Sequence, residues 1–292
     1  MTIKKIYEKK YKALLAIPFI LLLISVIYLL NYNIETGSFI NKGISLKGGT
    51  SLTIMDSQIS EADVVDLLSY EGELNSRVLS GSGEQIGLVL EIDETDDQKV
   101  DDIKSKIMDK YDVDENDISV ETMGSALGSS FFKETVKAMI FAFVFMGIVV
   151  FIYFRTPIPS TAVILAAVSD IFVTMAIVNM LGIKVGTAGI AAFLMLIGYS
   201  VDTDILLSTK VIKRKGGTVD DRIYSAMKTG MMMSLTTITA IVIALIFSQS
   251  PVITQIMQIL LIGLLVDLIN TWIQNAGILR WYMETKSRGA RK

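Results

Sequence analysis

Six blocks of apolar residues dominate the sequence and restrict what it can fold into. A helix needs about 20 apolar residues to cross the hydrocarbon core of a bilayer. The first block, "ALLAIPFILLLISVIYLL", is followed by "NYNIETGSF" without a small-residue cleavage site, which is typical of a retained membrane helix rather than a signal peptide. The sequence therefore predicts a polytopic α-helical membrane protein with six transmembrane helices, at residues 13–30, 136–154, 158–181, 185–207, 231–247 and 252–279.

The chain contains neither cysteine nor histidine. Without cysteine there is no disulfide framework and no thiolate metal site. Without histidine the commonest metal ligand and the usual group that titrates near neutral pH are both missing. We therefore expect no bound metal and no cofactor, and any proton chemistry must use carboxylates, Lys or Tyr.

Charge is divided unevenly along the chain. Residues 31–130 hold 21 Asp and Glu against 7 Lys and Arg, whereas the remaining bases gather next to alternate apolar blocks. Because bases accumulate on the cytoplasmic side of membrane proteins, we expect a protein of the cell membrane with both termini cytoplasmic. This topology assigns a cytoplasmic N-terminus (1–12), an extracytoplasmic domain and linker (31–134), helices two to six (135–279), a basic cytoplasmic loop (209–230) and a basic cytoplasmic tail (280–292).

The basic loop 209–230 has two interpretations. We expect its charges to be solvated and to touch anionic lipid headgroups. The alternative is that the loop docks a partner protein.

The segment between the first two membrane blocks has the pattern of a small folded domain. "GISLKGGTSLTIM" predicts a strand interrupted at Gly48 and Gly49, and "SEADVVDLLSYE" begins with a helix-capping pattern. "NSRVLS" and "QIGLVLEID" predict a hairpin, "DDQKVDDIKSKIMDKY" predicts a helix and "DISVETM" a last strand. This β-α-β-β-α-β order is typical of an α+β, ferredoxin-like domain.

Two features of this domain leave alternatives open. Gly48 and Gly49 are consistent with a β-bulge, which we favour, or with a close approach of two backbone segments. The acid-rich second helix is either a solvated face, which we favour, or a patch that meets a basic polypeptide.

Four carboxylates lie inside the predicted membrane helices: Asp170, Asp202, Asp204 and Asp267. Each costs about 2.5–3.5 kcal/mol at the centre of a membrane helix, and no Lys, Arg or His lies well inside a helix to pair with them. Hydroxyl and amide side chains are available instead. We expect support for the acids from Asn270, Thr271 and Gln274, which form a stripe with Asp267, and from Thr236 and Thr237.

A buried carboxylate without a cation tends to hold a proton. The four acids are therefore candidates for an ion or proton relay, and a sodium ion held by oxygens would use the same residues. The alternative is that the protonated acids only join helices through hydrogen bonds. Asp202 and Asp204 are about 200° apart around a regular helix, so we expect them to face different directions.

Four stretches together resemble the SecD–SecF family of protein-export membrane proteins, in the form of its archaeal SecF subunits. They are "GISLKGGT", "ETMGSALG", "SDIFVTMAI" and "GYSVDTDILLSTKVIKR", and the similarity extends over nearly the whole chain. The first stretch contains the outer-domain motif Gly48, Gly49 and Thr50, and the third contains Asp170. The resemblance implies an arrangement of the six helices like that in the RND transporter superfamily.

The fourth stretch departs from the bacterial members of that family. Those members have Asn and then Asp where this chain has Asp202 and then Thr203, so the family's acidic residue aligns with Thr203. They also carry an Arg that aligns near Thr229, with Lys228 beside it here. Because Asp202 aligns with the acid of the SecD subunit, we favour Asp202 over Asp204 for a buried seam, either within the bundle or shared with SecD.

The resemblance implies a subunit of the protein-export machinery and not an enzyme. Its expected partners are SecD as an obligate second half, the SecY channel, the exported polypeptide and membrane lipids, with no nucleic acid. A proton or sodium gradient would drive its contribution to export. Alternatives are half of an RND-like exporter of small molecules or lipids, and a structural subunit without ion coupling.

Overall fold

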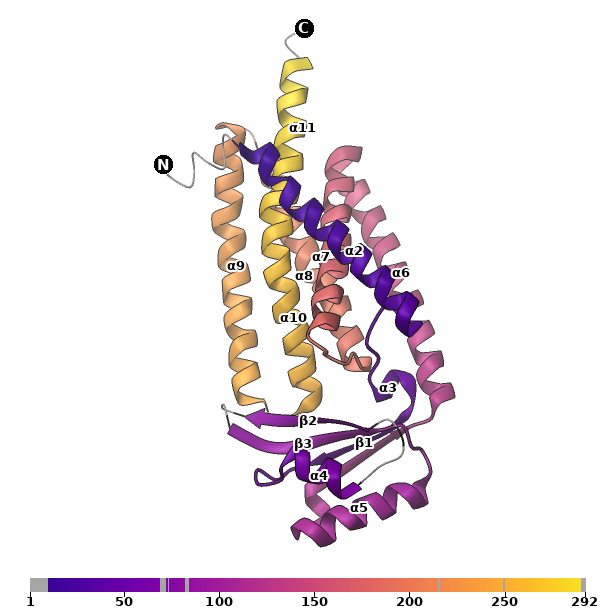
Figure 1. Ribbon diagram of the computed structural model, residues 1–292. Helices are drawn as coiled ribbons and strands as arrows, with labels where there is room; N and C mark the ends of the chain where they lie inside the picture. The colour runs from indigo at the N-terminus through magenta and orange to yellow at the C-terminus, as the bar shows by residue number, and fades with distance from the viewer. Residues whose placement is uncertain are drawn as a thin grey trace.

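The computed structural model consists of a bundle of long helices with a small α/β domain at one end (Figure 1). It describes residues 10–289 except 69–71, 73, 82–83, 215 and 249. Six helices are long and apolar enough to cross a membrane. Their bounds are Lys10–Thr36, whose main part is α2 (Ala16–Thr36); α6 (Ser125–Phe154); α7 (Pro157–Met180); α8 (Thr187–Ile212); α9 (Val219–Phe247); and α10 (Pro251–Ile269), which continues through η2 (Asn270–Asn275) into α11 (Ala276–Gly289).

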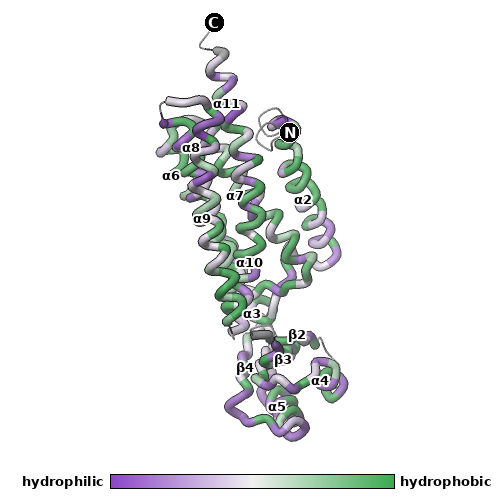
Figure 2. Tube along the Cα trace, turned by 90° about the vertical axis from the view of Figure 1, so that its left-hand side faces the viewer, coloured by the Kyte–Doolittle hydropathy of each residue, from purple (hydrophilic) through white to green (hydrophobic). Residues whose placement is uncertain are grey.

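The distribution of hydropathy agrees with a multi-pass membrane protein. The helices are largely apolar along their length, whereas the α/β domain mixes polar and apolar segments (Figure 2). α7 and α8 are the most buried of the six, and α2, α6 and α9 expose most of their apolar side chains. The centre of the bundle is therefore formed by α7, α8 and α10, and the outer helices present surfaces suited to lipid or to another membrane protein.

The α/β domain has the predicted β-α-β-β-α-β order. Its strands are β1 (Gly49–Ile54), β2 (Leu74–Gly81), β3 (Glu84–Ile92) and β4 (Ile118–Met123), and its helices are α4 (Glu61–Leu68) and α5 (Asp97–Tyr111), with the short turn η1 (Glu115–Asp117) before β4. The strands form one antiparallel sheet in the order β2-β3-β1-β4. Alternate residues of the sheet, such as Leu52 and Leu90, pack against Val100 and Ile107 in a single core. The ferredoxin-like prediction is confirmed.

The entry into this domain differs from the prediction in two respects. Ile44–Lys47 form a short helix, α3, so the strand begins only at Gly49. β1 pairs with β3 and β4 without a shift in register, so the predicted bulge is wrong. Gly48 and Gly49 have φ of 97° and 126°, and a side chain at position 49 would overlap the carbonyl oxygen of Ile92. The two glycines permit a close approach of backbones, which was the other alternative.

The helices extend beyond the apolar blocks where their ends are stabilised locally. α9 begins twelve residues before the apolar block that starts at residue 231, because Thr218 and Asp221 form a reciprocal capping box at its first turn. α6 begins at Ser125, directly after β4, so the last strand of the domain leads straight into a membrane helix. Parts of the predicted cytoplasmic N-terminus, hairpin turn, basic loop and cytoplasmic tail lie outside the described residues, at positions 1–9, 82–83, 215 and 290–292.

Side-chain contacts join the domain to the bundle. Lys184, in the loop between α7 and α8, forms an ion pair with Glu91 of β3 at 3.0 Å. Gln255 of α10 donates to the carbonyl of Lys184 at 2.5 Å and accepts from the backbone N–H groups of Gly186 and Gly189. The open face of the sheet therefore rests against the loops of the bundle at defined points.

A candidate functional site of three buried carboxylates

Three of the four acids predicted inside the membrane helices meet at the centre of the bundle. Asp170 comes from α7, Asp204 from α8 and Asp267 from α10, and each side chain is at most 1% exposed. We refer to these three residues as the carboxylate triad. Each is placed there by a helix whose buried stripe includes it, so the site follows from the packing of α7, α8 and α10.

The carboxylate of Asp170 accepts hydrogen bonds at both oxygens. Ser200 of α8 donates to Oδ2 at 2.5 Å, and Asn270 of η2 donates to Oδ1 at 2.8 Å. Asp170 is therefore tied to two neighbouring helices, and Asn270 acts as predicted from the polar stripe.

Asp204 and Asp267 share one hydroxyl group. Thr271 Oγ1 lies 2.9 Å from Asp267 Oδ1 and 3.1 Å from Asp204 Oδ1. Thr203 donates to the carbonyl of Ser200 in its own helix at 2.8 Å and also lies 3.4 Å from Asp267 Oδ2, and Asn275 donates to Asp204 Oδ1 at 2.6 Å. A single hydroxyl proton can serve only one acceptor at a time, so Thr271 couples the hydrogen bonding of the two acids.

The shared Thr271 hydroxyl brings the carboxyl groups of Asp204 and Asp267 close together. Neighbouring buried carboxylates oppose each other's ionisation unless a cation compensates their charge. In the described part of the chain no Lys or Arg bonds to the triad. The arrangement is therefore suited to holding protons, or a cation from outside the chain, at its carboxyl groups.

The π-helical turn η2 sets which polar side chains face the triad. The N–H of Ala276 bonds back to the carbonyl of Thr271, five residues earlier, which widens the helix locally. The wider turn advances each residue by roughly 80° instead of 100° around the axis. Asn275 thereby turns towards Asp204, and Gln274 turns towards α7, where it donates to Ser169 at 3.2 Å.

Within the bundle of this chain, Asp202 does not lie in a buried seam. Asp202 lies on the exposed face of α8 with Tyr199, whereas the buried stripe of α8 contains Ser200, Thr203 and Asp204. The expectation that Asp202 and Asp204 face different directions is confirmed, because one is exposed and the other is fully buried. A seam between Asp202 and SecD stays a prediction.

Other predicted residues lie away from the triad. Thr236 and Thr237 both bond back to the carbonyl of Met233 in their own helix, and α9 exposes that face. Thr50, beside Gly48 and Gly49, donates to the carbonyl of Glu94 at 2.6 Å within the α/β domain. These residues do not support the acids.

Sequence analysis missed Thr203 and Asn275 as partners of the acids. Thr203 lies between Asp202 and Asp204, and the sequence analysis considered it only as the position that aligns with the family's acid. Asn275 lies about 80° from Asp267 on a regular helix and enters the site only because of the π-helical turn. Ser200, Thr203, Asp204 and Leu207 follow the helical spacing i, i+3, i+4 and i+7. This spacing in the sequence already indicated that Ser200 and Thr203 share a face of the helix with Asp204.

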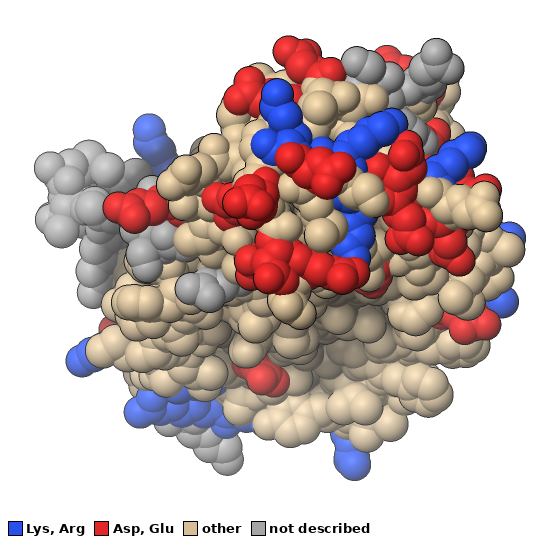
Figure 3. All heavy atoms as spheres, turned by 90° about the horizontal axis from the view of Figure 1, so that it is seen from below, with Lys and Arg blue, Asp and Glu red and all other residues tan. Residues whose placement is uncertain are grey.

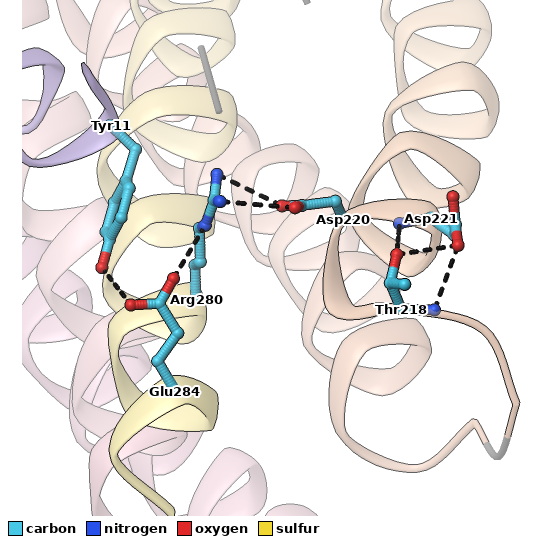
Figure 4. Close-up of polar contacts among 6 residues, drawn as sticks. All are labelled: Tyr11, Thr218, Asp220, Asp221, Arg280 and Glu284. Carbon is cyan, nitrogen blue, oxygen red and sulfur yellow. Dashed lines mark hydrogen bonds and ion pairs between the residues drawn. The ribbon is translucent and has the colours of Figure 1, made fainter. Parts of the chain in front are cut away.

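A second polar network joins helices at the end of the bundle away from the α/β domain (Figure 4). Arg280 of α11 pairs with Asp220 of α9 at 3.2 Å and with Glu284 at 3.2 Å. Tyr11 of the first helix donates to Glu284 at 2.7 Å, and its ring lies 4.5 Å from the Arg280 guanidinium. The network fixes α11, which continues from η2, against the first and fifth membrane helices.

A sequence model described as "Protein export membrane protein SecD/SecF, C-terminal" matches residues 103–285. The protein-export membrane protein SecF of Methanocaldococcus jannaschii is 42% identical over 284 residues, covering 94% of this chain and 96% of that protein. The chain belongs to the SecD/SecF family. SecF of Pyrococcus furiosus is 37% identical over 284 residues, covering 96% of this chain and 94% of that protein, so the likeness to archaeal SecF proteins extends over almost the full length.

The fold agrees with a solved SecD/SecF structure. The crystal structure of SecDF, a translocon-associated membrane protein from Thermus thermophilus, superposes with a TM-score of 0.77 at 17% sequence identity. It covers 97% of this chain, but this chain spans only 40% of that longer one. The region matched by the SecD/SecF family model contains the whole carboxylate triad and its polar partners.

Proposed function

We propose that this membrane protein is one half of a SecD–SecF complex that uses a transmembrane proton or sodium gradient to assist protein export. The observation that carries the proposal is the carboxylate triad, which is buried in the membrane part of the chain without a bonded cation among the described residues. Acids at this position are costly and usually mark an ion pathway. The protein would act without covalent chemistry of its own.

The partners follow from the family and from the size of the chain. The SecDF protein from Thermus is much longer than this chain, which supports SecD as an obligate second half here. Its description as translocon-associated supports the SecY channel and an exported polypeptide as further partners. Membrane lipids would surround the apolar outer faces of α2 and α6.

The proposed orientation places the α/β domain outside the cell membrane and both termini in the cytoplasm. Both ends of the described chain lie at the end of the bundle opposite to the α/β domain (Figure 1). Seen from the domain, acidic side chains gather on the surface (Figure 3). In α5 and the turn after it, Asp101, Asp109 and Asp114 are exposed. Basic residues such as Lys213 and Arg214 lie at the opposite end, as the positive-inside rule requires.

Reconstitution of the chain with its partner subunit and the channel tests this function. We expect Asp170→Asn and Asp267→Asn each to abolish the stimulation of export by an imposed proton or sodium gradient, because a neutral amide cannot exchange a proton. Thr236→Val is the matched control, since Thr236 bonds only within its own helix. Co-purification with the partner subunit checks that assembly is intact.

Full stimulation in both triad variants would contradict the proposal. The acids would then serve only to hold helices together, an alternative that the many hydrogen bonds of the triad also favour.

A further inference from the structure

A cavity of about 510 Å³ lies between the open face of the sheet and the ends of the membrane helices that are nearest to the domain. One wall is formed by β2 and β3, and the other by the loop between α7 and α8 and by the adjacent ends of α9 and α10. β2 lies next to the ends of α9 and α10 (Figure 1). The cavity is therefore at the level where these helices leave the membrane.

Two donors in this cavity have no partner in the described structure. Arg77 of β2 is exposed in the lining, and its guanidinium forms no hydrogen bond or ion pair with a described residue. The hydroxyl group of Thr254, in the first turn of α10, is buried and also lacks a partner among the described residues. The start of α10 adds the positive end of its helix dipole. Because a buried hydroxyl group without a partner costs free energy, these groups together indicate a bound acceptor.

The charge of the lining indicates what kind of acceptor fits. Besides Arg77, the charged residues of the lining are Lys184 and Glu91, which pair with each other at 3.0 Å. This pairing offsets the repulsion of an anion by the Glu91 carboxylate, and the lining keeps one net positive charge. A phosphodiester matches this lining, because it carries a single negative charge on oxygens that accept from a guanidinium and a hydroxyl group.

Apolar side chains continue from the cavity onto the membrane surface of the bundle. Leu181 and Leu245 line the cavity beside the polar groups. Next to them, Met180 at the end of α7 and Phe247 at the end of α9 are 69% and 71% exposed. In a bilayer these side chains contact acyl chains. A ligand that combines a phosphodiester with acyl chains is a phospholipid.

We propose that this cavity binds the headgroup of an anionic phospholipid, with Arg77 and Thr254 as donors to its phosphodiester. The lipid chains then lie along the exposed ends of α7 and α9. β2 is the edge strand farthest from β4, which leads directly into α6. The lipid therefore ties to the membrane the edge of the sheet that lies farthest from this connection. The inference goes beyond the proposed function, since it requires neither an ion gradient nor an exported polypeptide.

A free phosphate ion or an acidic stretch of polypeptide would meet the same donors. Neither of them covers the apolar side chains beside the cavity, whereas a lipid covers both the polar and the apolar part. The observations therefore favour the lipid, and the test includes the other two ligands as competitors.

Titration of the full chain in detergent with phosphatidylglycerol, followed by native mass spectrometry, tests the inference. We expect phosphatidylcholine, whose headgroup has no net charge, to bind at least about tenfold more weakly. Arg77→Gln should weaken the binding of phosphatidylglycerol at least about tenfold, because a charge-assisted hydrogen bond is lost. Arg77→Lys should retain most of the affinity. Thr254→Val, which keeps the shape and the charge, should weaken binding by about three- to tenfold.

Lys106→Gln is the control, because it removes one positive charge from the same domain, where Lys106 pairs with Asp102 outside the cavity. It should leave the affinity unchanged. The unfolding temperature without lipid shows whether each variant is folded.

Equal affinities for the two lipids, or equal losses in Arg77→Gln and Lys106→Gln, would overturn the inference in favour of a general attraction of charge. So would an unchanged affinity in Thr254→Val, because the buried hydroxyl group would then have no part in binding. Displacement of the lipid by inorganic phosphate at a similar concentration would assign the cavity to a free anion. Displacement by a short acidic peptide would assign it to a polypeptide.

Discussion

At the scale of single residues, the chain places its most constrained positions where two segments meet. The triad shows this in the membrane, where each acid depends on a hydroxyl or amide from another helix. In the α/β domain the same holds for Gly49, whose positive φ and close contact with Ile92 exclude a side chain. Composition cannot reveal such positions, because the constraint comes from a neighbour distant in sequence.

Gly49→Ala should destabilise the protein. A side chain at φ of 126° is strained by about 1–3 kcal/mol, and the overlap with the Ile92 carbonyl adds to this cost. We expect a loss of at least about 2 kcal/mol, measured as a lower unfolding temperature and faster proteolysis of the α/β domain in the full chain.

Gly124→Ala is the control for that variant. Gly124 ends the same domain, has φ of −65°, and has open space where a side chain would lie. We expect a change within about 0.5 kcal/mol. Equal losses in both variants would show that the junction tolerates no side chain for reasons other than the contact with Ile92.

At the scale of elements, η2 is the feature that organises the site. The six helices follow from hydropathy, but the π-helical turn decides which amides of the last helix reach which acid. It packs against α9 at Gly230, where a side chain would overlap the ring of Trp272. Trp272 directly follows Thr271, whose hydroxyl group is shared by Asp204 and Asp267.

Gly230→Ala should therefore destabilise the bundle by about 1–3 kcal/mol, as overpacking does in other cores. Gly198→Ala provides the matched comparison, because Gly198 also lies inside a helix but has nothing within 4 Å of its missing side chain. That variant should be neutral or stabilised by up to about 1 kcal/mol, since Ala favours helix over Gly. Thermal unfolding in detergent measures both, and a stabilised Gly230→Ala variant would show that η2 moves freely.

At the scale of the whole molecule, the α/β domain is attached to the bundle by chain connections and by an ion pair at the same end of its sheet. β1 and β4 connect there to α3 and α6, and Glu91, opposite Ser51 in the register of β1 and β3, pairs with Lys184. The pair is mostly buried, with 23% and 12% of the two side chains exposed. Any movement of the domain relative to the membrane would have to break it.

A double-mutant cycle of Lys184→Gln and Glu91→Gln should show a coupling energy of about 1 kcal/mol, since the pair is partly screened by solvent. Both single variants should increase hydrogen exchange in the loop between α7 and α8 and in β3. Lys99→Gln is the control, because Lys99 pairs with Glu94 inside the domain at 2.7 Å. Unchanged exchange in the loop would mean that the hydrogen bonds of Gln255 alone hold this loop in place.

The sequence by itself determined the class of the protein. Long apolar blocks admit few structures other than membrane helices, and the alternation in residues 49–123 was sufficient for the order of strands and helices in the α/β domain. Three of the four candidate acids lie together with Asn270 and Thr271 in one buried site, as expected, whereas Gln274 bonds to Ser169 and not to an acid. Their part in ion coupling stays a prediction. The acids could be recognised in the sequence because a carboxylate inside an apolar membrane helix costs free energy wherever it lies along that helix.

Only the tertiary structure decided which acid faces inwards and which amide meets it. Periodicity separates Asp202 from Asp204 but does not say which of the two faces is covered, since that depends on how α8 packs against α7 and α10. The local widening at η2, which brings Asn275 to Asp204, is not indicated by the hydropathy pattern of the sequence. The site was therefore predictable in its composition but not in its geometry, because rotation about a helix axis is fixed by neighbouring helices.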